Sequence, residues 1–506
     1  MVVPKINRLL PAPLFCTAVS SAVGFYFLSS LTLVYCIAVL LVSVLSLCFF
    51  RVLASSISLV FAEYQEPVYR EHQFFKLMAA CSAAIAAGLV LGLCAANAGR
   101  SGVHFAIDTD RITAVEGVLQ DDPGITANGN AVVSLYLKRC AAEGGFRASS
   151  KGEITVFFPQ ESAAKLKEFG RGASVFAEGS LRKASRSSGT VWTFSAKSMH
   201  IVKAAPAIER MRTGIRRNLI KRFDGKDWGG LSLALLLGIK DNLDTNLAVM
   251  YRKAGCSYIL ALSGMHLAVL AALIAFLLKK PLGLKPASIA GAAIILLYCF
   301  IVGPMPSLNR AALMYLLGVA AILGALPAKP LSILNLSFLI QIVISPAAGH
   351  SISFVLSYLA LAGILIITPP LYSLFTGKVP DFILKPLSAS FGAFLATAGV
   401  SGFSFGMIVP TGIIAGLFLV PLTTFFMIGS LVWLVFDLFS FSGFLNMPLS
   451  LLYRLMESIV TTAGSIPGIS AGKPFFVLAF SIVLSLLIAV FEYKQREMRL
   501  RLLPFQ

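Results

Sequence analysis

The chain has 506 residues, of which 57% are hydrophobic and only 13% are charged, and its mean hydropathy is +0.84. Soluble globular proteins are far more polar, so this composition excludes that class and predicts several transmembrane helices. Lysine and arginine outnumber aspartate and glutamate by 42 to 23, which gives a formal net charge of +19. The excess fits basic loops that set orientation and contact anionic lipid, or a polyanionic partner.

Three apolar segments come first, near residues 12–30, 33–50 and 74–96. Lys5 and Arg8 precede the first segment, as in a signal peptide, but a second apolar segment follows with no clear cleavage site. We therefore interpret residues 1–98 as N-terminal transmembrane helices.

Residues 99–205 are polar and rich in glycine and serine, and they contain five segments of alternating apolar residues. These segments are RITAVEGVLQ, AVVSLYLKRC, GEITVFF, ASVFAEGSL and VWTFSAKSMHIV. They predict a small β domain, either a barrel of the oligonucleotide/oligosaccharide-binding (OB) type or a β-sandwich. Phe157, Phe158 and Trp192 are candidates for stacking on nucleotide bases, and packing in the core is the alternative role of such aromatic residues.

Residues 206–255 begin with a basic amphipathic segment. An apolar stripe recurs at helical spacing, and seven of the residues from 210 to 226 are basic; the stripe is Ile208, Met211, Ile215 and Leu219. The pattern predicts an amphipathic helix followed by interfacial helices. Such a helix suits anionic lipid headgroups or a phosphate backbone, with Arg217 and Lys221 as candidate DNA contacts.

Residues 256–492 return to membrane character. Apolar segments lie near 256–278, 287–303, 308–326, 331–346, 351–368, 386–402, 406–438, 445–465 and 474–491. Together with the first three segments they predict eleven or twelve helices, because the one near 445–465 carries Arg454 and Glu457 and also suits the interface. We expect a polytopic all-α membrane protein with an inserted small β-barrel domain.

Basic residues in the short loops and in the tail at 493–506 fall on one side of the membrane if the crossings alternate. Lys279, Lys280 and Lys285 are among them. The positive-inside rule assigns this side to the cytoplasm, which makes the β domain extracytoplasmic.

Ser263, Gly264 and His266 open a long apolar segment, where ionisable residues are uncommon. On a helix, the spacing of three places Ser263 and His266 on one face. Three roles are open to the pair: a structural hydrogen bond, the lining of a hydrophilic path, or a nucleophile and its base.

The segment VGPMPSLNRAALMYLLG at 302–318 interrupts an apolar stretch with Gly303, Pro304 and Pro306. We expect Ser307 to cap the helix that follows, with Arg310 in its first turn. Free N–H groups and an arginine would then form an anion site, unless Arg310 extends outward to the membrane interface.

Further polar residues are sparse in this region. Ser353 and Ser357 lie four apart, with Tyr358 next to the second serine, and the carboxylates between 256 and 490 are Asp381, Asp437 and Glu457. This scarcity disfavours an ion-coupled transporter, although Asp437 keeps that class open. The sequence has no phosphate-binding loop and no metal-ligand motif, so we expect no catalytic residues, no metal and no cofactor.

The motifs in this half resemble those of the ComEC family of competence proteins. YRKAGCSYILALSGMH at 251–266 matches the family pattern FRxAGxxHLLAxSGxH, and weaker matches are ALLLGIKDNL, SLNRA, FVLSY and GLFLVP. The chain departs from the family at Tyr258, Val355 and Gly416, where members carry histidine, glutamine and asparagine. It has Ser345–Pro346 where an Asp-Pro pair is common.

The resemblance implies an inner-membrane channel that passes single-stranded DNA into the bacterial cytoplasm during natural transformation. It also implies a separate cytosolic ATPase, DNA-delivery proteins and a possible homo-oligomer as partners, besides membrane lipids. We interpret the chain as the short form without the family's metallo-β-lactamase-like domain, and hence as no enzyme. The DNA-path candidates are Ser263, Gly264, His266, Ser307, Arg310, Ser353, Ser357 and Tyr358. The alternative function is a secondary transporter of a small anionic solute.

Overall fold

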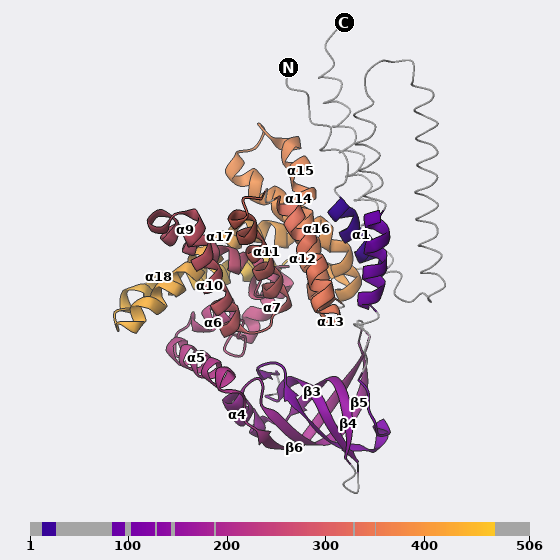
Figure 1. The fold of residues 1–506 in the computed structure, drawn as a ribbon. Coiled ribbons are helices and arrows are strands. Elements are labelled where there is room, and N and C mark those ends of the chain that lie inside the picture. The colour runs from indigo at the N-terminus through magenta and orange to yellow at the C-terminus, as the bar shows by residue number, and fades with distance from the viewer. Residues whose placement is uncertain are drawn as a thin grey trace, which may run out of the picture. The chain divides into compact units, whose positions relative to one another are not determined.

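The computed structural model describes residues 13–26, 83–96, 103–126, 129–142, 147–186, 189–326, 329–349 and 351–470 (Figure 1). The expected helices at 33–50 and 474–491 and the tail at 493–506 lie outside these residues. The chain forms two compact units. The first unit contains Met1–Ser101 and Leu316–Tyr358, and the second contains Gly102–Tyr315 and Leu359–Gln506.

The first unit is held together by close helix contacts. Its elements are α1 (Pro13–Tyr26), the helix Ala83–Ala96, α12 (Pro330–Ile344), α13 (Pro346–Gly349) and parts of α11 and α14. Gly88 and Gly92 lie so close to α1 that a Cβ on either would overlap its backbone or the Ser20 hydroxyl. Small residues allow this approach between apolar helices. The Tyr26 hydroxyl also donates to the Gly349 carbonyl (2.7 Å).

The β domain of the second unit is a closed five-stranded barrel. Its strands are β1 (Ile112–Leu119), β3 (Ala131–Ala142), β4 (Arg147–Phe158), β5 (Ser174–Arg186) and β6 (Gly189–Lys203). They pair in the order β1-β5-β6-β4-β3, and β3 pairs again with β1. The pair β4–β6 is parallel and the others are antiparallel. The five expected strands are therefore confirmed, and closure favours the barrel over the sandwich.

Alternation of side chains explains the barrel core. On β3, Val133, Leu135 and Leu137 are buried, because residues two apart point to the same face of a strand. The two-residue strand β2 (Gly124–Ile125) pairs with β3. A helix that the sequence did not predict, α4 (Gln160–Phe169), connects β4 to β5.

The helices of the second unit follow the barrel along the chain (Figure 1). They are α5 (Ala207–Phe223), α6 (Gly229–Leu237), α7 (Thr245–Lys253), α8 (Ser257–Leu260), α9 (Gly264–Leu282), α10 (Leu284–Val302), the first part of α11 (Pro306–Leu323), the end of α14 (Ile352–Ile366), α15 (Thr368–Phe375), α16 (Asp381–Phe405), α17 (Thr411–Leu438) and α18 (Asn446–Gly464). The two-residue strands β7 (Met407–Ile408) and β8 (Ile469–Ser470) pair with each other.

Five of the described helices, α9, α10, α11, α16 and α17, are long and apolar enough to cross a membrane. A sixth span is possible if α14 and α15, which meet at a 40° bend, count as one. The described residues therefore support a membrane protein but fewer spans than the eleven or twelve expected for the whole chain. The expected segment at 331–346 is α12, a helix of 15 residues. The segment at 445–465 is α18, which is not among the candidate spans.

The core of the helical region is built around α6. Eight of its nine residues are buried, which fits a short helix that is apolar on all sides. Trp228, which precedes α6, packs edge-on against Trp433 of α17 with ring centroids 5.2 Å apart. Ser232 and Ser430 share a hydrogen bond of 2.8 Å in the same interface. The packing fixes α6 against α17 and so positions the segments on either side of α6.

Candidate functional site

The N-terminus of α9 is closed by a hydrogen-bonded cap. The Ser263 hydroxyl accepts from the Met265 N–H (3.3 Å), and His266 Nδ1 accepts from the Ser263 N–H (3.2 Å). The same ring nitrogen lies 3.0 Å from the Ser263 hydroxyl oxygen. Ser263 thus precedes the helix as its N-cap and does not share a helix face with His266. This geometry favours the structural role among the three that the sequence left open, because two groups of Ser263 engage one ring nitrogen.

Arg310 lies directly beside this cap. A Cβ on Gly264 would be 3.7 Å from Arg310 Nη2 and 3.6 Å from the Ala311 Cβ, so the first turn of α9 contacts the second turn of α11. Arg310 is only 6% exposed, which corrects the alternative that it extends outward to the interface. The absence of a side chain at Gly264 leaves room for the guanidinium group. The structure therefore brings Ser263, Gly264, His266 and Arg310 together.

The helix after the break, α11, begins two residues earlier than the sequence suggested. Pro306 is the first residue of α11, as is common for proline, so Ser307 lies inside the first turn and is not the N-cap. The Met305 carbonyl instead accepts from the Asn309 N–H (2.9 Å). Gly303 has φ +99°, a left-handed value that ends α10 and that glycine adopts without strain. Arg310 therefore projects from a helix that starts anew at this break.

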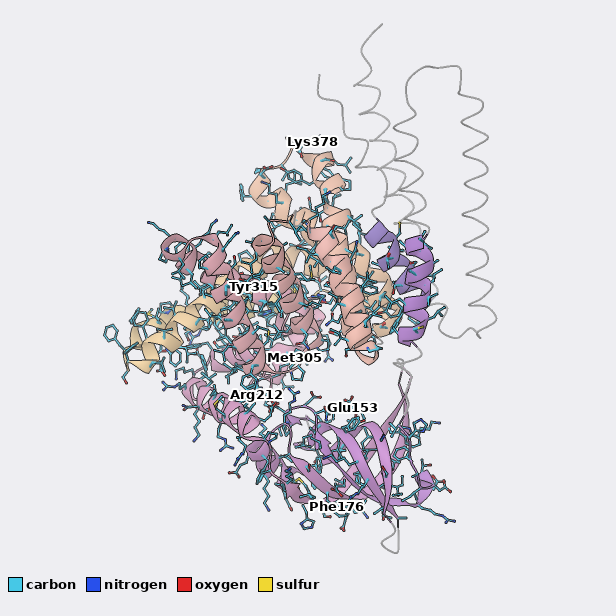
Figure 2. All side chains as sticks on the ribbon, in the orientation of Figure 1. Glu153, Phe176, Arg212, Met305, Tyr315 and Lys378 are labelled. Atoms are coloured by element: carbon cyan, nitrogen blue, oxygen red, sulfur yellow. The ribbon has the colours of Figure 1, made fainter. Side chains whose placement is uncertain are left out.

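Two arginines that the sequence did not single out hold the other side of the break. Arg212 donates from Nε to the Phe300 carbonyl (2.9 Å) and from Nη2 to the Val302 carbonyl (3.0 Å). Arg216 donates to the Val302 carbonyl as well (2.8 Å). These are C-terminal carbonyls of α10, which lack helical partners and carry partial negative charge. Figure 2 shows Arg212 on α5 near the end of α10, with Met305 close by.

Asp122 connects these arginines to the barrel. Its carboxylate contacts Arg212 Nη2 (2.5 Å) and Arg216 Nε (3.3 Å). Arg212 is 1% exposed, so its charge is satisfied almost entirely by the protein. Burial lowers the pKa of Arg216, and the nearby Asp122 carboxylate opposes that shift. Asp122, 90 positions before Arg212 in the sequence, thus completes the junction. No local sequence pattern predicts this contact.

The long motif at 251–266 packs against the start of α17. A Cβ on Gly412 would lie 2.8 Å from the Gly255 carbonyl oxygen, so the two backbones approach closely. A Cβ on Gly416 would overlap the Tyr258 hydroxyl. Tyr258 and Gly416 are two positions at which the sequence departs from the family pattern. The structure places these departures in contact, so the larger side chain on one side faces the smaller residue on the other.

The candidates on α14 belong to the first unit. Tyr358 is buried and its hydroxyl donates to Gln341 Oε1 (2.9 Å) of α12. Ser353 is exposed and Ser357 is half-buried. The Tyr358 ring also packs edge-on against Phe338, with centroids 5.2 Å apart. Tyr358 is therefore part of a packed polar and aromatic cluster, in which Gln341 is a residue that the sequence reasoning missed.

The barrel aromatics divide into core and surface. Phe158 is 1% exposed and packs in the barrel core, which selects the core role over base stacking for this residue. Phe157 is half-buried. Trp192 is half-buried between the Phe105 ring, with centroids 5.1 Å apart, and Lys183 Nζ, 5.8 Å from its centroid. Tyr136 on β3 is exposed and was not predicted, although its position in an alternating strand was the available signal.

The remaining candidates lie on α5 and at the end of α17. Arg217 and Lys221 are both exposed, and Arg217 donates to the Glu168 carbonyl (3.3 Å). Asp437 pairs with Arg222 (2.7 Å) and accepts from the Ser442 hydroxyl (3.0 Å). Asp437, the carboxylate that left ion-coupled transport as an alternative, therefore forms an ion pair at the end of α17. Among the described residues, no group of three or more histidine, cysteine, aspartate or glutamate side chains is arranged to hold a metal ion.

These features define a membrane protein in which the basic helix α5 joins a β barrel to apolar helices. Among these helices, Arg310 is buried beside the N-terminus of α9. The chain belongs to the competence protein family, whose sequence model matches residues 235–496. The matched region contains α9, the break and Arg310, whereas the barrel and α5 precede it.

The chain is also similar to ComE operon protein 3 of Bacillus subtilis (strain 168). The two are 25% identical over 175 residues, which cover 33% of this chain and 23% of that protein. The similarity therefore spans about a quarter of the relative's length. It agrees with the family that the motifs at 251–266 indicated.

Proposed function

We propose that the protein passes single-stranded DNA inward across the bacterial cytoplasmic membrane during natural transformation. The observation that carries the proposal is the buried guanidinium of Arg310 beside the N-terminus of α9. N-terminal N–H groups and a guanidinium both attract phosphate, and in an apolar surrounding their field is weakly screened. Membership of the competence protein family supports DNA uptake as the process that this positive site serves.

The barrel is the proposed first contact of the strand. Its closed order, its parallel pair β4–β6 and the helix between its third and fourth long strands support an OB-type barrel. Trp192 with Lys183, and the exposed Tyr136, offer ring faces and positive charge at the barrel surface. Stacking on such rings is tolerant of sequence, as a general uptake protein requires.

The strand would then pass the break at Gly303–Arg310 and the N-terminus of α9. One buried arginine attracts successive phosphates without holding any of them, and conduction requires such weak, serial sites. The Ser263–His266 cap contributes by fixing the direction of the α9 N-terminus. Ser307, on the same helix as Arg310, stays a candidate for the proposed path. Ser353, Ser357 and Tyr358 of the first unit stay candidates from the sequence alone. The sequence has no nucleotide-binding loop, so a separate cytosolic ATPase is the proposed source of work, with DNA-delivery proteins outside.

The positions of the helix ends support an extracytoplasmic barrel. The C-terminus of α10 meets Asp122 of the barrel through Arg212, while Lys279, Lys280 and Lys285 lie at the opposite end of α10 and its neighbour α9. If these basic residues face the cytoplasm, as the positive-inside rule proposes, the barrel faces outward.

The test reverses one charge at the centre of the site. We expect Arg310→Glu to abolish transformation, because a buried carboxylate repels phosphate, and Arg310→Lys to retain part of it. Lys378→Glu, the same charge reversal in an exposed loop, should leave transformation unchanged. Membrane fractionation checks that each variant inserts. Normal transformation by inserted Arg310→Glu would refute the role of Arg310.

The alternative proposal is secondary transport of a small anion. The positive site beside α9 suits a small anion as well as a phosphate backbone, but coupling needs a proton carrier, and Asp437 is paired with Arg222. Anion uptake into vesicles that follows a pH gradient and ignores DNA would favour this alternative.

A further inference from the structure

We infer that the exposed face of α5 lies on the membrane surface and binds anionic lipid headgroups. This inference concerns residues 207–223 and does not depend on whether the protein conducts DNA. It rests on three features of α5: where its buried residues attach, which side chains it leaves exposed, and how these exposed side chains are distributed around the helix.

The buried side of α5 is attached to the ends of two candidate membrane spans. Arg212 binds the last carbonyls of α10, and Arg222 binds Asp437 in the last turn of α17. The two arginines are ten residues apart, which is about 15 Å along a helix. The end of a membrane-spanning helix lies near the boundary between hydrocarbon and headgroups. A helix fastened to two such ends must therefore run along that boundary.

The exposed side of α5 combines apolar and basic side chains. Ile208 is 63% exposed and Met211 is 57% exposed, and Arg210, Arg217 and Lys221 are exposed as well. Ile208 and Met211 are the first two members of the apolar stripe that the sequence showed. The buried positions of α5 are Arg212, Thr213 and Phe223. Arg212 is buried because it donates to the carbonyls at the end of α10.

The two kinds of exposed side chain occupy separate strips of the helix. At about 100° per residue, Arg210, Arg217 and Lys221 lie within about 40° of one another, and Ile208 and Met211 form a second strip whose centre is about 130° away. This is the arrangement of an interfacial helix, whose apolar strip enters the acyl boundary while its basic strip meets headgroup phosphates. A DNA backbone would satisfy the basic strip but would leave Ile208 and Met211 in water. The combination therefore favours a lipid surface over DNA as the partner.

The first experiment identifies what touches the apolar strip. A benzophenone amino acid replaces Met211 in the full chain, reconstituted in vesicles of phosphatidylglycerol and phosphatidylcholine with a fluorescent single-stranded oligonucleotide present. The control carries the same probe at His200, an exposed position on β6 of the barrel that pairs in register with Phe176, labelled on the barrel in Figure 2. We expect at least tenfold more lipid adduct at 211 than at 200. Equal lipid adducts at both positions, or a DNA adduct in place of lipid at 211, would overturn the inference.

The second experiment tests the basic strip. The triple variant Arg210→Gln, Arg217→Gln, Lys221→Gln carries the probe at 211, and the ratio of phosphatidylglycerol to phosphatidylcholine adducts is measured. One basic residue near an anionic surface contributes about fivefold to binding, so the ratio should fall by at least that factor. The exposed positions leave the core intact, so the unfolding midpoint should be unchanged and a folding defect can be recognised. An unchanged ratio in a folded triple variant would contradict headgroup binding.

Discussion

Replacing Arg212 by methionine tests the junction between the barrel, α5 and α10. Methionine is apolar and of similar length, so it fills part of the space while removing every donor. The change removes the hydrogen bonds that Arg212 donates to the Phe300 and Val302 carbonyls. It also removes one of the two ion pairs of Asp122. Arg216 stays in place and continues to serve Val302 and Asp122.

The expected cost follows from these contacts. A hydrogen bond from a charged donor contributes about 1.5–3 kcal/mol, and removing one partner of a buried ion pair costs about 3–5 kcal/mol. Because Arg216 compensates in part, we expect a loss near the lower limit, about 3 kcal/mol. Arg217→Met on the exposed side of the same helix should change stability by less than about 0.5 kcal/mol.

The assay is equilibrium unfolding in detergent micelles, followed by the fluorescence of Trp228 and Trp433, which lie in the core next to α5. Arg212→Met should unfold at a clearly lower denaturant concentration than Arg217→Met. A double-mutant cycle with Asp122→Asn should give a coupling free energy of about 1 kcal/mol or more. If Arg212→Met and Arg217→Met unfold at the same midpoint as the unaltered protein, the junction does not stabilise the fold and our reasoning fails.

Two further predictions use glycines of the site. Gly303→Ala should destabilise the protein more than Gly283→Ala. Both residues have left-handed φ values, but only the Cβ at 303 would meet a neighbour, Arg212 Nη2 at 2.5 Å. Equal losses in the free energy of unfolding would contradict this prediction. Gly416→Asn should overlap Tyr258, and Tyr258→His should relieve the overlap, so the double variant should be more stable than the sum of the single changes by about 1 kcal/mol. Strict additivity in the same unfolding assay would show that the two positions are independent.

The barrel was predictable because each strand carries its signal locally. Alternation along 131–142 identifies β3 and its buried face without reference to other strands. Phe158 shows the limit of that signal, since alternation does not say which face of β4 a barrel encloses. Helix α4 escaped prediction because it is short and only weakly apolar.

The candidate site was predictable only where its residues were themselves unusual for a membrane segment. Arg310 and the cap at Ser263 stood out in an apolar sequence, and the structure places them side by side. Arg212 did not stand out among seven basic residues, because its importance comes from carbonyls about 90 residues away. The carbonyl groups at the end of α10 accept hydrogen bonds from Arg212, so the side of α5 that carries Arg212 is buried.

The most direct test of DNA translocation follows labelled DNA in cells of the source bacterium. The gene is deleted and then restored with the unaltered sequence or with Arg310→Glu, and surface-bound and nuclease-protected cytoplasmic DNA are counted separately. We predict that deletion and Arg310→Glu abolish the cytoplasmic pool of labelled DNA while surface binding persists, and that the unaltered gene restores that pool. Labelled DNA that reaches the cytoplasm at the normal rate in the deletion strain would contradict the proposed function.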